Sequence, residues 1–277
     1  MLTYSVGILV IIVLIFIYLL DDLHILYINI GLTYLHDYMT LSLNKSPKFS
    51  NVVFLLSHDH GILPEYAQQS IEIITQYCLS HNYKLEIRNH CPNDTISPYW
   101  LRVVDLIDLS KKYDENTMFI YMDLDATVNP KYFDLRIEDL IHAIDIYDNK
   151  TYDIYIGRDN SFIRRANTGV IFLRNTVFTK KLLEYWLKQY KRSKWYKVNG
   201  KWICEINEKK CKWTRDGYEQ EELNKIYNNN IMNDKRIKML HTSICSNFSI
   251  SHDCFIYHLM SKRNKNKMSI IYSRLNQ

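Results

Sequence analysis

Short apolar runs alternate with amphipathic helical patterns from about residue 51 onward, and this alternation limits the folds open to the chain. The run from Asn51 to Ser57 is continuously apolar between turn-forming residues, which is typical of a strand buried on both faces. After Pro64, apolar residues recur on one helix face at Ala67, Ile71, Ile74 and Cys78. Doubly buried strands joined through helices predict an α/β layer architecture.

The same alternation continues to the end of the chain. Further strands are predicted at 84–88, 119–122, 152–157, 170–174, 237–245 and 254–258. Further helices are predicted at 100–112, 136–146, 178–186 and 218–227. The segment 191–215 is rich in Lys and Trp and lacks a clear period, so we interpret it as a surface insertion.

The first residues predict a membrane anchor. Residues 1–20 carry no charged side chain and are almost wholly aliphatic after Ser5, and at ~1.5 Å per residue such a helix just spans the ~30 Å hydrocarbon core of a bilayer. A cleaved signal peptide would begin with basic residues, which are missing here, while a buried core helix stays an alternative. We therefore predict a transmembrane anchor at 1–20, a stem at 21–50 and one folded domain at 51–277. Because the first basic residue is Lys45, charge does not fix the orientation of the anchor.

Composition excludes some functions and leaves other questions open. The 277 residues carry 35 basic and 30 acidic side chains, a net charge of +5, which gives no indication of nucleic-acid binding. Six cysteines are present without metal-binding spacing, and they are compatible with either disulfides or free thiols. Four Asn-x-Ser/Thr sequons are compatible with a secretory compartment, although an Asn-rich chain also produces them by chance.

Two carboxylates directly follow one of the predicted buried strands. Asp123 and Asp125 come after the apolar run Phe119 to Met122, and their mutual repulsion is costly unless a cation offsets it. In open α/β sheets, ligands bind beyond the carboxyl ends of the strands. Carboxylates together with phosphate oxygens suit Mn²⁺ or Mg²⁺. The pair therefore predicts a divalent-metal site that binds a diphosphate, rather than a solvated turn.

Other polar residues are weaker candidates for the same site. The Asn167-Thr168-Gly169 triplet leads into a predicted strand and fits either close backbone approach to a substrate or an ordinary turn. Glu219 and Gln220 open a predicted helix, where exposure to solvent is the simpler interpretation. His258 could complete the carboxylate metal site. Lys262 and Arg263 follow it and could contact a diphosphate, or form a solvated surface.

Taken together, these motifs resemble the pattern of glycosyltransferase family 34, which contains fungal galactosyl- and mannosyltransferases and plant xyloglucan xylosyltransferases. The likeness spans about residues 51–263. The motifs occur in the order Ser57-His-Asp-His60, Tyr99-Trp-Leu-Arg102, Phe119-Ile-Tyr-Met-Asp-Leu-Asp-Ala126, Asn167-Thr-Gly-Val-Ile-Phe-Leu-Arg-Asn175, Trp186, Glu219-Gln220 and His258. Each is unspecific alone, so the resemblance depends on their order and spacing.

The resemblance implies a GT-A fold, a type II membrane topology, Mn²⁺ dependence and retention of anomeric configuration. It implies that Asp123, Asp125 and His258 bind the metal. The residues expected around the nucleotide-sugar donor are Ser57, Arg102, Asp123, Asp125, Thr168, Gly169, Lys262 and Arg263. Those expected at the reacting centre are Asn167, Glu219 and Gln220. Arg102 stands where the family usually has Lys.

The expected activity is transfer of a hexose or pentose to a glycan or glycoprotein. The chain departs from the family at Tyr218, where some members have an acid, and at Met260-Ser261, where Gly-Cys is usual, so the sugar stays open. A transferase of another GT-A family, such as a glycogenin-like enzyme, and an inactive membrane-anchored carbohydrate-binding protein are the alternatives. A transferase of this kind would face the Golgi or ER lumen, or host secretory membranes if the gene is viral.

Overall fold

The computed structural model describes residues 49–92, 95–159, 165–212, 215–231, 234–246, 253–260 and 262–276. The predicted anchor at 1–20 and nearly all of the predicted stem lie outside this part of the chain. Within the described residues, no helix has both the length and the apolarity that crossing a bilayer requires.

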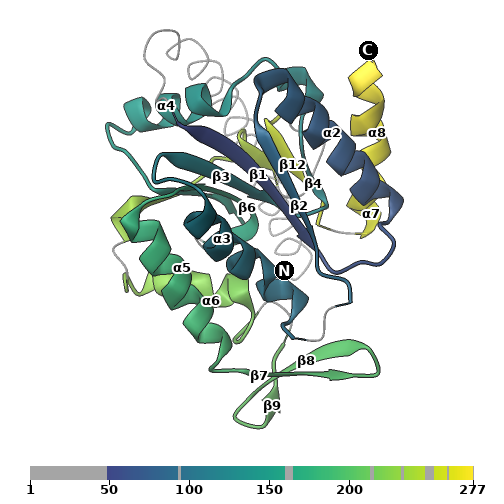
Figure 1. Ribbon diagram of the computed structural model, residues 1–277, viewed down its shortest axis with the longest axis vertical. Coiled ribbons are helices and arrows are strands. Elements are labelled where there is room, and N and C mark those ends of the chain that lie inside the picture. Colours follow the sequence, from purple (N-terminus) through teal and green to yellow (C-terminus); the bar gives the residue numbers. More distant parts are fainter. Residues whose placement is uncertain are drawn as a thin grey trace, which may run out of the picture.

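A six-stranded sheet forms the centre of the domain (Figure 1). Its strands lie in the order β10-β5-β6-β3-β1-β2. Their bounds are β1 Asn51–His58, β2 Lys84–Asn89, β3 Thr117–Met122, β5 Ile154–Arg158, β6 Ala166–Arg174 and β10 Ile237–Met239. Only β6 runs antiparallel to its neighbours β3 and β5, while the other described pairs are parallel. The predicted α/β architecture is confirmed, and the structure shows that the sheet has a parallel core.

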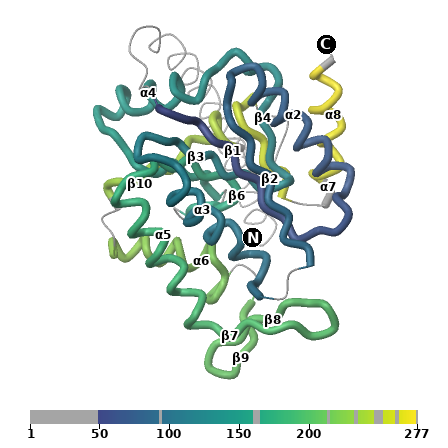
Figure 2. Tube along the Cα trace, in the orientation of Figure 1, coloured from purple at the N-terminus to yellow at the C-terminus, as the bar shows by residue number. Residues whose placement is uncertain are grey.

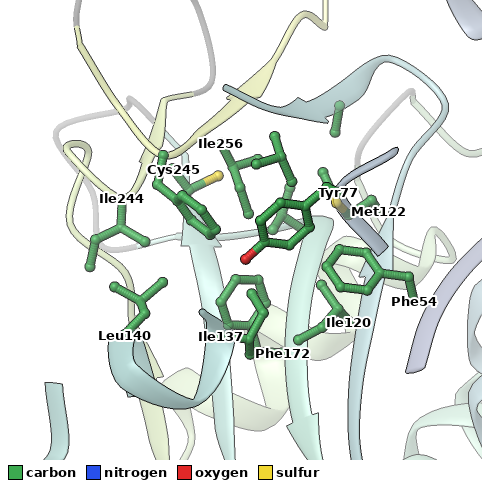
Figure 3. Close-up of a cluster of buried hydrophobic side chains, with 14 of the residues drawn as sticks. Phe54, Tyr77, Ile120, Met122, Ile137, Leu140, Phe172, Ile244, Cys245 and Ile256 are labelled. Carbon is green, nitrogen blue, oxygen red and sulfur yellow. The ribbon is translucent and has the colours of Figure 1, made fainter. Parts of the chain in front are cut away.

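Helices cover both faces of this sheet (Figures 1 and 2). Helices α2 (Glu65–His81) and α4 (Ile137–Tyr147) pack on one face, and α3 (Leu101–Lys112), α5 (Val177–Tyr190) and α6 (Glu219–Asn228) pack on the other. In β1, Phe54 lies in the first of these cores and Val53 in the second. Figure 3 shows Phe54, Tyr77 and Phe172 packed in the first core. Burial on both faces explains why β1 is continuously apolar.

A second, smaller sheet joins the last part of the chain to the end of β3. It contains β4 (Ala126–Val128), β11 (Cys245–Ser246) and β12 (Ile256–His258). Strand β12 pairs antiparallel with β4, so that His258 lies opposite Ala126. The short helices α7 (Lys262–Lys265) and α8 (Met268–Tyr272) follow, and α8 packs against α2. Short 3₁₀ helices lie at Pro98–Trp100, Pro130–Tyr132, Asp234–Arg236 and Ser273–Asn276.

Two sequence-based expectations about secondary structure need correction. The single strand predicted at 237–245 is two short strands, β10 and β11, which belong to different sheets. The insertion predicted without a regular pattern is a three-stranded antiparallel sheet of β7 (Lys194–Val198), β8 (Lys201–Ile206) and β9 (Lys209–Lys210). A disulfide joins Cys204 to Cys211 within it. Nearly all residues of its strands are exposed or half-exposed, so burial imposes no alternating apolar pattern on them.

Candidate functional site

A cleft of about 510 Å³ opens beyond the carboxyl ends of β1 and β3. Ser57 and His58 end β1, Asp123 directly follows β3, and antiparallel β6 begins at the same edge of the sheet. Nine of the predicted site residues line this cleft, namely Ser57, Arg102, Asp123, Asp125, Asn167, Thr168, Glu219, Gln220 and His258. The topology therefore brings together side chains from six parts of the sequence at one edge of the sheet.

Asp123, Asp125 and His258 form a compact group in the cleft. One potential ligand atom from each lies within 4.8 Å of the other two. The Nε2 atom of His258 is 3.2 Å from Asp125 Oδ1 and 3.7 Å from Asp123 Oδ2. The pairing of β12 with β4 produces this arrangement, because it places His258 opposite Ala126, the residue that follows Asp125 and lies 132 residues earlier in the sequence.

Gly169 lies behind the imidazole of His258 and does not line the cleft. A Cβ atom at this position would lie 2.0 Å from Cε1 and 2.6 Å from Nε2 of His258. The backbone oxygen of Gly169 accepts a hydrogen bond from the backbone N–H of Asp123 at 2.8 Å. Gly169 thus leaves room for the histidine ring and fixes the backbone position of Asp123.

Lys265 forms an ion pair with Asp125. Its Nζ lies 2.9 Å from Asp125 Oδ2. Burial raises the pKa of Asp125, but the hydrogen bond to His258 and the charge of Lys265 outweigh it and hold that pKa well below its usual range. Asp125 is therefore ionised and has its negative charge already offset on one side.

Arg102 on α3, whose side chain is 11% exposed, is the centre of a second charged network. Its guanidinium lies 3.0 Å from Asp123 Oδ1 and 3.6 Å from Glu219 Oε1. Burial lowers the pKa of Arg102, but the negative charge of Asp123 and of other neighbouring groups raises it by more than burial lowers it. The net shift of this pKa is therefore upward. The hydroxyl of Tyr121 donates to Asp123 Oδ1 at 2.7 Å. One carboxylate oxygen of Asp123 is thereby held in place by the protein, while Oδ2 faces His258.

Thr168 connects this network to the start of α6. Arg102 donates to the backbone oxygen of Thr168 at 2.8 Å, and the Thr168 hydroxyl donates to Glu219 Oε1 at 3.2 Å. The backbone N–H of Thr168 donates to Gln220 Oε1 at 3.2 Å. Burial raises the pKa of Glu219, and Arg102 opposes that rise. Glu219 is a buried, hydrogen-bonded group rather than a solvated helix start.

Asn167 holds the turn into β6. Its Oδ1 accepts from the backbone N–H of Gly169 at 2.9 Å, and its side-chain amide contacts Met260 Sδ at 3.0 Å. The indole N–H of Trp186 donates to the backbone oxygen of Glu219 at 2.8 Å. Asn167 and Trp186 therefore fix the backbone of two segments that line the cleft.

Two functional candidates were missed in the sequence. Asp105 is buried on α3, where it accepts from the Ser57 hydroxyl at 2.6 Å and lies 2.9 Å from His90 Nε2. A signal existed, because Leu101, Asp105 and Leu109 share one helix face with the core. Lys265 stands in the basic stretch 262–267, but its proximity to Asp125 follows only from the tertiary fold.

Lys262 and Arg263, the predicted diphosphate contacts, lie in α7, which follows His258 closely. Their side chains fall outside the described residues. Their predicted role therefore stays a prediction.

Comparison with known proteins gives a consistent result. The model of the family described as nucleotide-diphospho-sugar transferase matches residues 96–269. This range includes every site residue predicted from the sequence except Ser57. A crystal structure of a glycosyltransferase involved in the glycosylation of the major capsid of PBCV-1 matches with a TM-score of 0.55 and 18% identity, over 79% of this chain and 99% of that chain. At this identity, the likeness concerns the fold. Comparison with curated proteins finds no match.

Proposed function

Because the chain belongs to the nucleotide-diphospho-sugar transferase family, we propose that it is a metal-dependent, retaining glycosyltransferase with a glycan or glycoprotein acceptor. The observation that carries the proposal is the Asp123, Asp125 and His258 group in the cleft at the strand ends. The motifs and their order support membership of glycosyltransferase family 34, with a hexose or pentose as the transferred sugar.

The donor set fits a divalent ion. Neighbouring ligands of an octahedral ion with bonds of about 2.1 Å lie roughly 3 Å apart, and His258 Nε2 is 3.2 Å from Asp125 Oδ1. Two carboxylates with one imidazole suit Mn²⁺, and Mg²⁺ is the second candidate. When bound there, the ion would neutralise charge on the donor diphosphate.

The residues around the metal ligands have distinct proposed tasks. Arg102 keeps Asp123 oriented through the 3.0 Å contact to Oδ1. Thr168 and Ser57 offer hydroxyls to the donor, while Lys262 and Arg263 meet the diphosphate. Gln220, Glu219 and Asn167 border the sugar, where Gln220 supplies an amide to the reacting face. Glu219 accepts a hydrogen bond from the Thr168 hydroxyl and so holds Thr168 in place.

We further propose that residues 1–20 anchor the enzyme as a type II membrane protein facing the Golgi or ER lumen. The apolar N-terminal run supports the anchor. The Cys204–Cys211 disulfide supports an oxidising compartment. Expression with a tag at each end, followed by protease protection of sealed vesicles, tests the orientation. Digestion of the C-terminal tag without detergent would contradict it.

The activity is tested with purified protein, a panel of nucleotide sugars and Mn²⁺ or Mg²⁺, with nucleotide release as the measurement. We expect one of the nucleotide sugars to release its nucleotide, and this release to require the metal ion. Asp125→Asn and His258→Ala should each abolish release or reduce it at least tenfold. Lys235→Ala, an exposed position at the opposite end of the sheet, is the control. Metal-independent release would contradict the proposed metal dependence. No release with any donor would contradict the transferase function and favour a binding protein.

A further inference from the structure

The sheet formed by β7, β8 and β9, here called the basic hairpin, concentrates the positive charge of the protein. Residues 191–212 contain eight basic and two acidic side chains, a net +6, so the rest of the chain carries −1 of the total +5. All eight basic residues are exposed. They are Lys191, Arg192, Lys194, Lys197, Lys201, Lys209, Lys210 and Lys212. A field of this sign, focused on one projection, attracts anions.

The basic hairpin is joined to the wall of the cleft. Trp195 packs against Tyr99 and Tyr218, with ring centroids 5.9 and 5.2 Å away, and both tyrosines line the cleft. The disulfide end of the hairpin lies against Gly217, where a Cβ would be 2.5 Å from Cys204 Sγ. The hairpin is thus fixed at the cleft rim at two points, and it projects away from the domain beyond α5 and α6 (Figures 1 and 2).

One face of the hairpin continues this aromatic wall outward. The register pairs Trp195 with Cys204 and Lys197 with Trp202, and residues two apart on a strand share a face. Trp195, Lys197 and Trp202 therefore lie on the same face, with the Lys197 ammonium 5.8 Å from the Trp202 ring centroid. The indole of Trp202 is half-buried, which leaves part of a flat apolar surface beside an exposed cation.

We propose that the basic hairpin is an acceptor-docking surface for an anionic glycan, one that carries carboxylate groups. The proposal rests on the proposed transferase function, because it assigns the acceptor side of that cleft. Lysines attract and pair with the carboxylates, and the indole faces cover the apolar faces of sugar rings. A membrane surface fits less well, since the tip of the hairpin is Asn199-Gly200 with Val198 as its exposed apolar neighbour.

The test compares two triple variants of the full-length protein with equal changes in charge. The hairpin variant is Lys197→Glu/Lys201→Glu/Lys209→Glu. The control variant is Lys111→Glu/Lys181→Glu/Lys235→Glu, whose exposed lysines lie near the opposite end of the sheet. Binding is measured by calorimetry at ~50 mM salt, where screening is weak. The probes are polygalacturonate, neutral dextran, polyglutamate and vesicles containing anionic lipid.

We expect the parent and the control variant to bind polygalacturonate alike, and the hairpin variant to bind it at least tenfold more weakly. Dextran should not bind. Trp202→Ala should weaken binding of polygalacturonate at least threefold without affecting polyglutamate. Equal binding by both triple variants, or tighter binding of polyglutamate or vesicles than of polygalacturonate, would overturn the proposal.

Nucleotide release without acceptor separates this proposal from the transferase function. We expect the same release rate for the parent and the hairpin variant, because none of the three lysines lines the cleft. If the parent releases no nucleotide, the transferase function fails while the binding measurements still decide the docking surface. Reduced release in the hairpin variant alone would contradict a surface that acts only on the acceptor.

Discussion

Gly169 and His258 compete for the same space: a Cβ atom on Gly169 would lie 2.0 Å from Cε1 of the imidazole. The ring is almost fully buried and faces Asp123 and Asp125 on its other side. Any side chain at position 169 must therefore push the imidazole towards the carboxylates or rotate it away from them. The glycine is required by a histidine that lies 89 residues later in the sequence.

Gly169→Ala should accordingly weaken Mn²⁺ binding by about 10- to 100-fold, the range found when the support of a metal ligand is lost. Overpacking should also lower the free energy of unfolding by ~1–3 kcal/mol. Calorimetric titration with Mn²⁺ and chemical denaturation measure the two effects. Gly157→Ala on the neighbouring strand is the matched control, because its Cβ would meet no atom closer than 3.4 Å. Unchanged Mn²⁺ affinity in Gly169→Ala would remove His258 from the metal site.

The central strands could be predicted because they are buried on both faces, as Val53 and Phe54 in β1 illustrate. The acidic pair could be predicted because it directly follows such a strand. The contact between Gly169 and His258 could not, since β12 and β4 are three residues long and so short a strand has no readable period. For the same reason, Gly169 was interpreted as a point of substrate approach, whereas the structure shows it against a side chain.

The buried charges were also difficult to predict. The sequence places Asp105 and Glu219 on predicted helices and Lys265 in a basic stretch after His258, but it does not reveal whether an opposite charge meets them in the interior. Glu219 was taken alone as a solvated helix start, although it is buried and contacts Arg102 from another helix. Burial of a carboxylate becomes understandable only once its partner is known.

Lys265→Met should increase the affinity for Mn²⁺ in the absence of nucleotide by about threefold to tenfold, or ~0.7–1.4 kcal/mol. The ammonium of Lys265 lies 2.9 Å from Asp125 Oδ2 and competes with the ion for that carboxylate. Methionine keeps most of the length of the side chain and removes the charged ammonium. Titration without donor is the measurement, with Lys131→Met, which pairs with Asp253 instead, as control. Weaker Mn²⁺ binding in Lys265→Met would contradict the competition.

Arg102→Met should lower the free energy of unfolding by ~3–5 kcal/mol, because it leaves carboxylates without their buried cation. Arg102 lies 3.0 Å from Asp123 and 3.6 Å from Glu219. Adding Glu219→Gln to this variant should recover part of the loss, with a coupling energy of ~1–3 kcal/mol. Urea denaturation of the two single variants and the double variant measures it. Arg136→Met, at a more exposed ion pair, should cost at most ~1 kcal/mol. Additive effects of Arg102→Met and Glu219→Gln would contradict their contact.

His241 should make the folded protein less stable as the pH falls below about 6.5, the ordinary value for imidazole. Burial lowers the pKa of His241, and the charges of Arg158 and Lys238 lower it further. Its Nδ1 accepts a hydrogen bond from the backbone N–H of Ser243 at 3.2 Å, a contact that requires that nitrogen to be unprotonated. The unfolded chain therefore takes up a proton at a pH where the folded protein resists it.

The stabilisation from neutral His241 is fully present above pH 6.5 and is lost as the pH falls through the lowered pKa of the folded state. One proton contributes at most ~1.4 kcal/mol per pH unit to this loss. His241→Asn keeps an acceptor for the Ser243 N–H and does not titrate. Urea denaturation of both proteins from pH 8 to pH 5 isolates the contribution of His241, since other groups act equally in each. We expect the difference in unfolding free energy to be constant above pH 7 and to shift in favour of His241→Asn below 6.5. A constant difference over the whole range would show that His241 titrates normally in the folded protein.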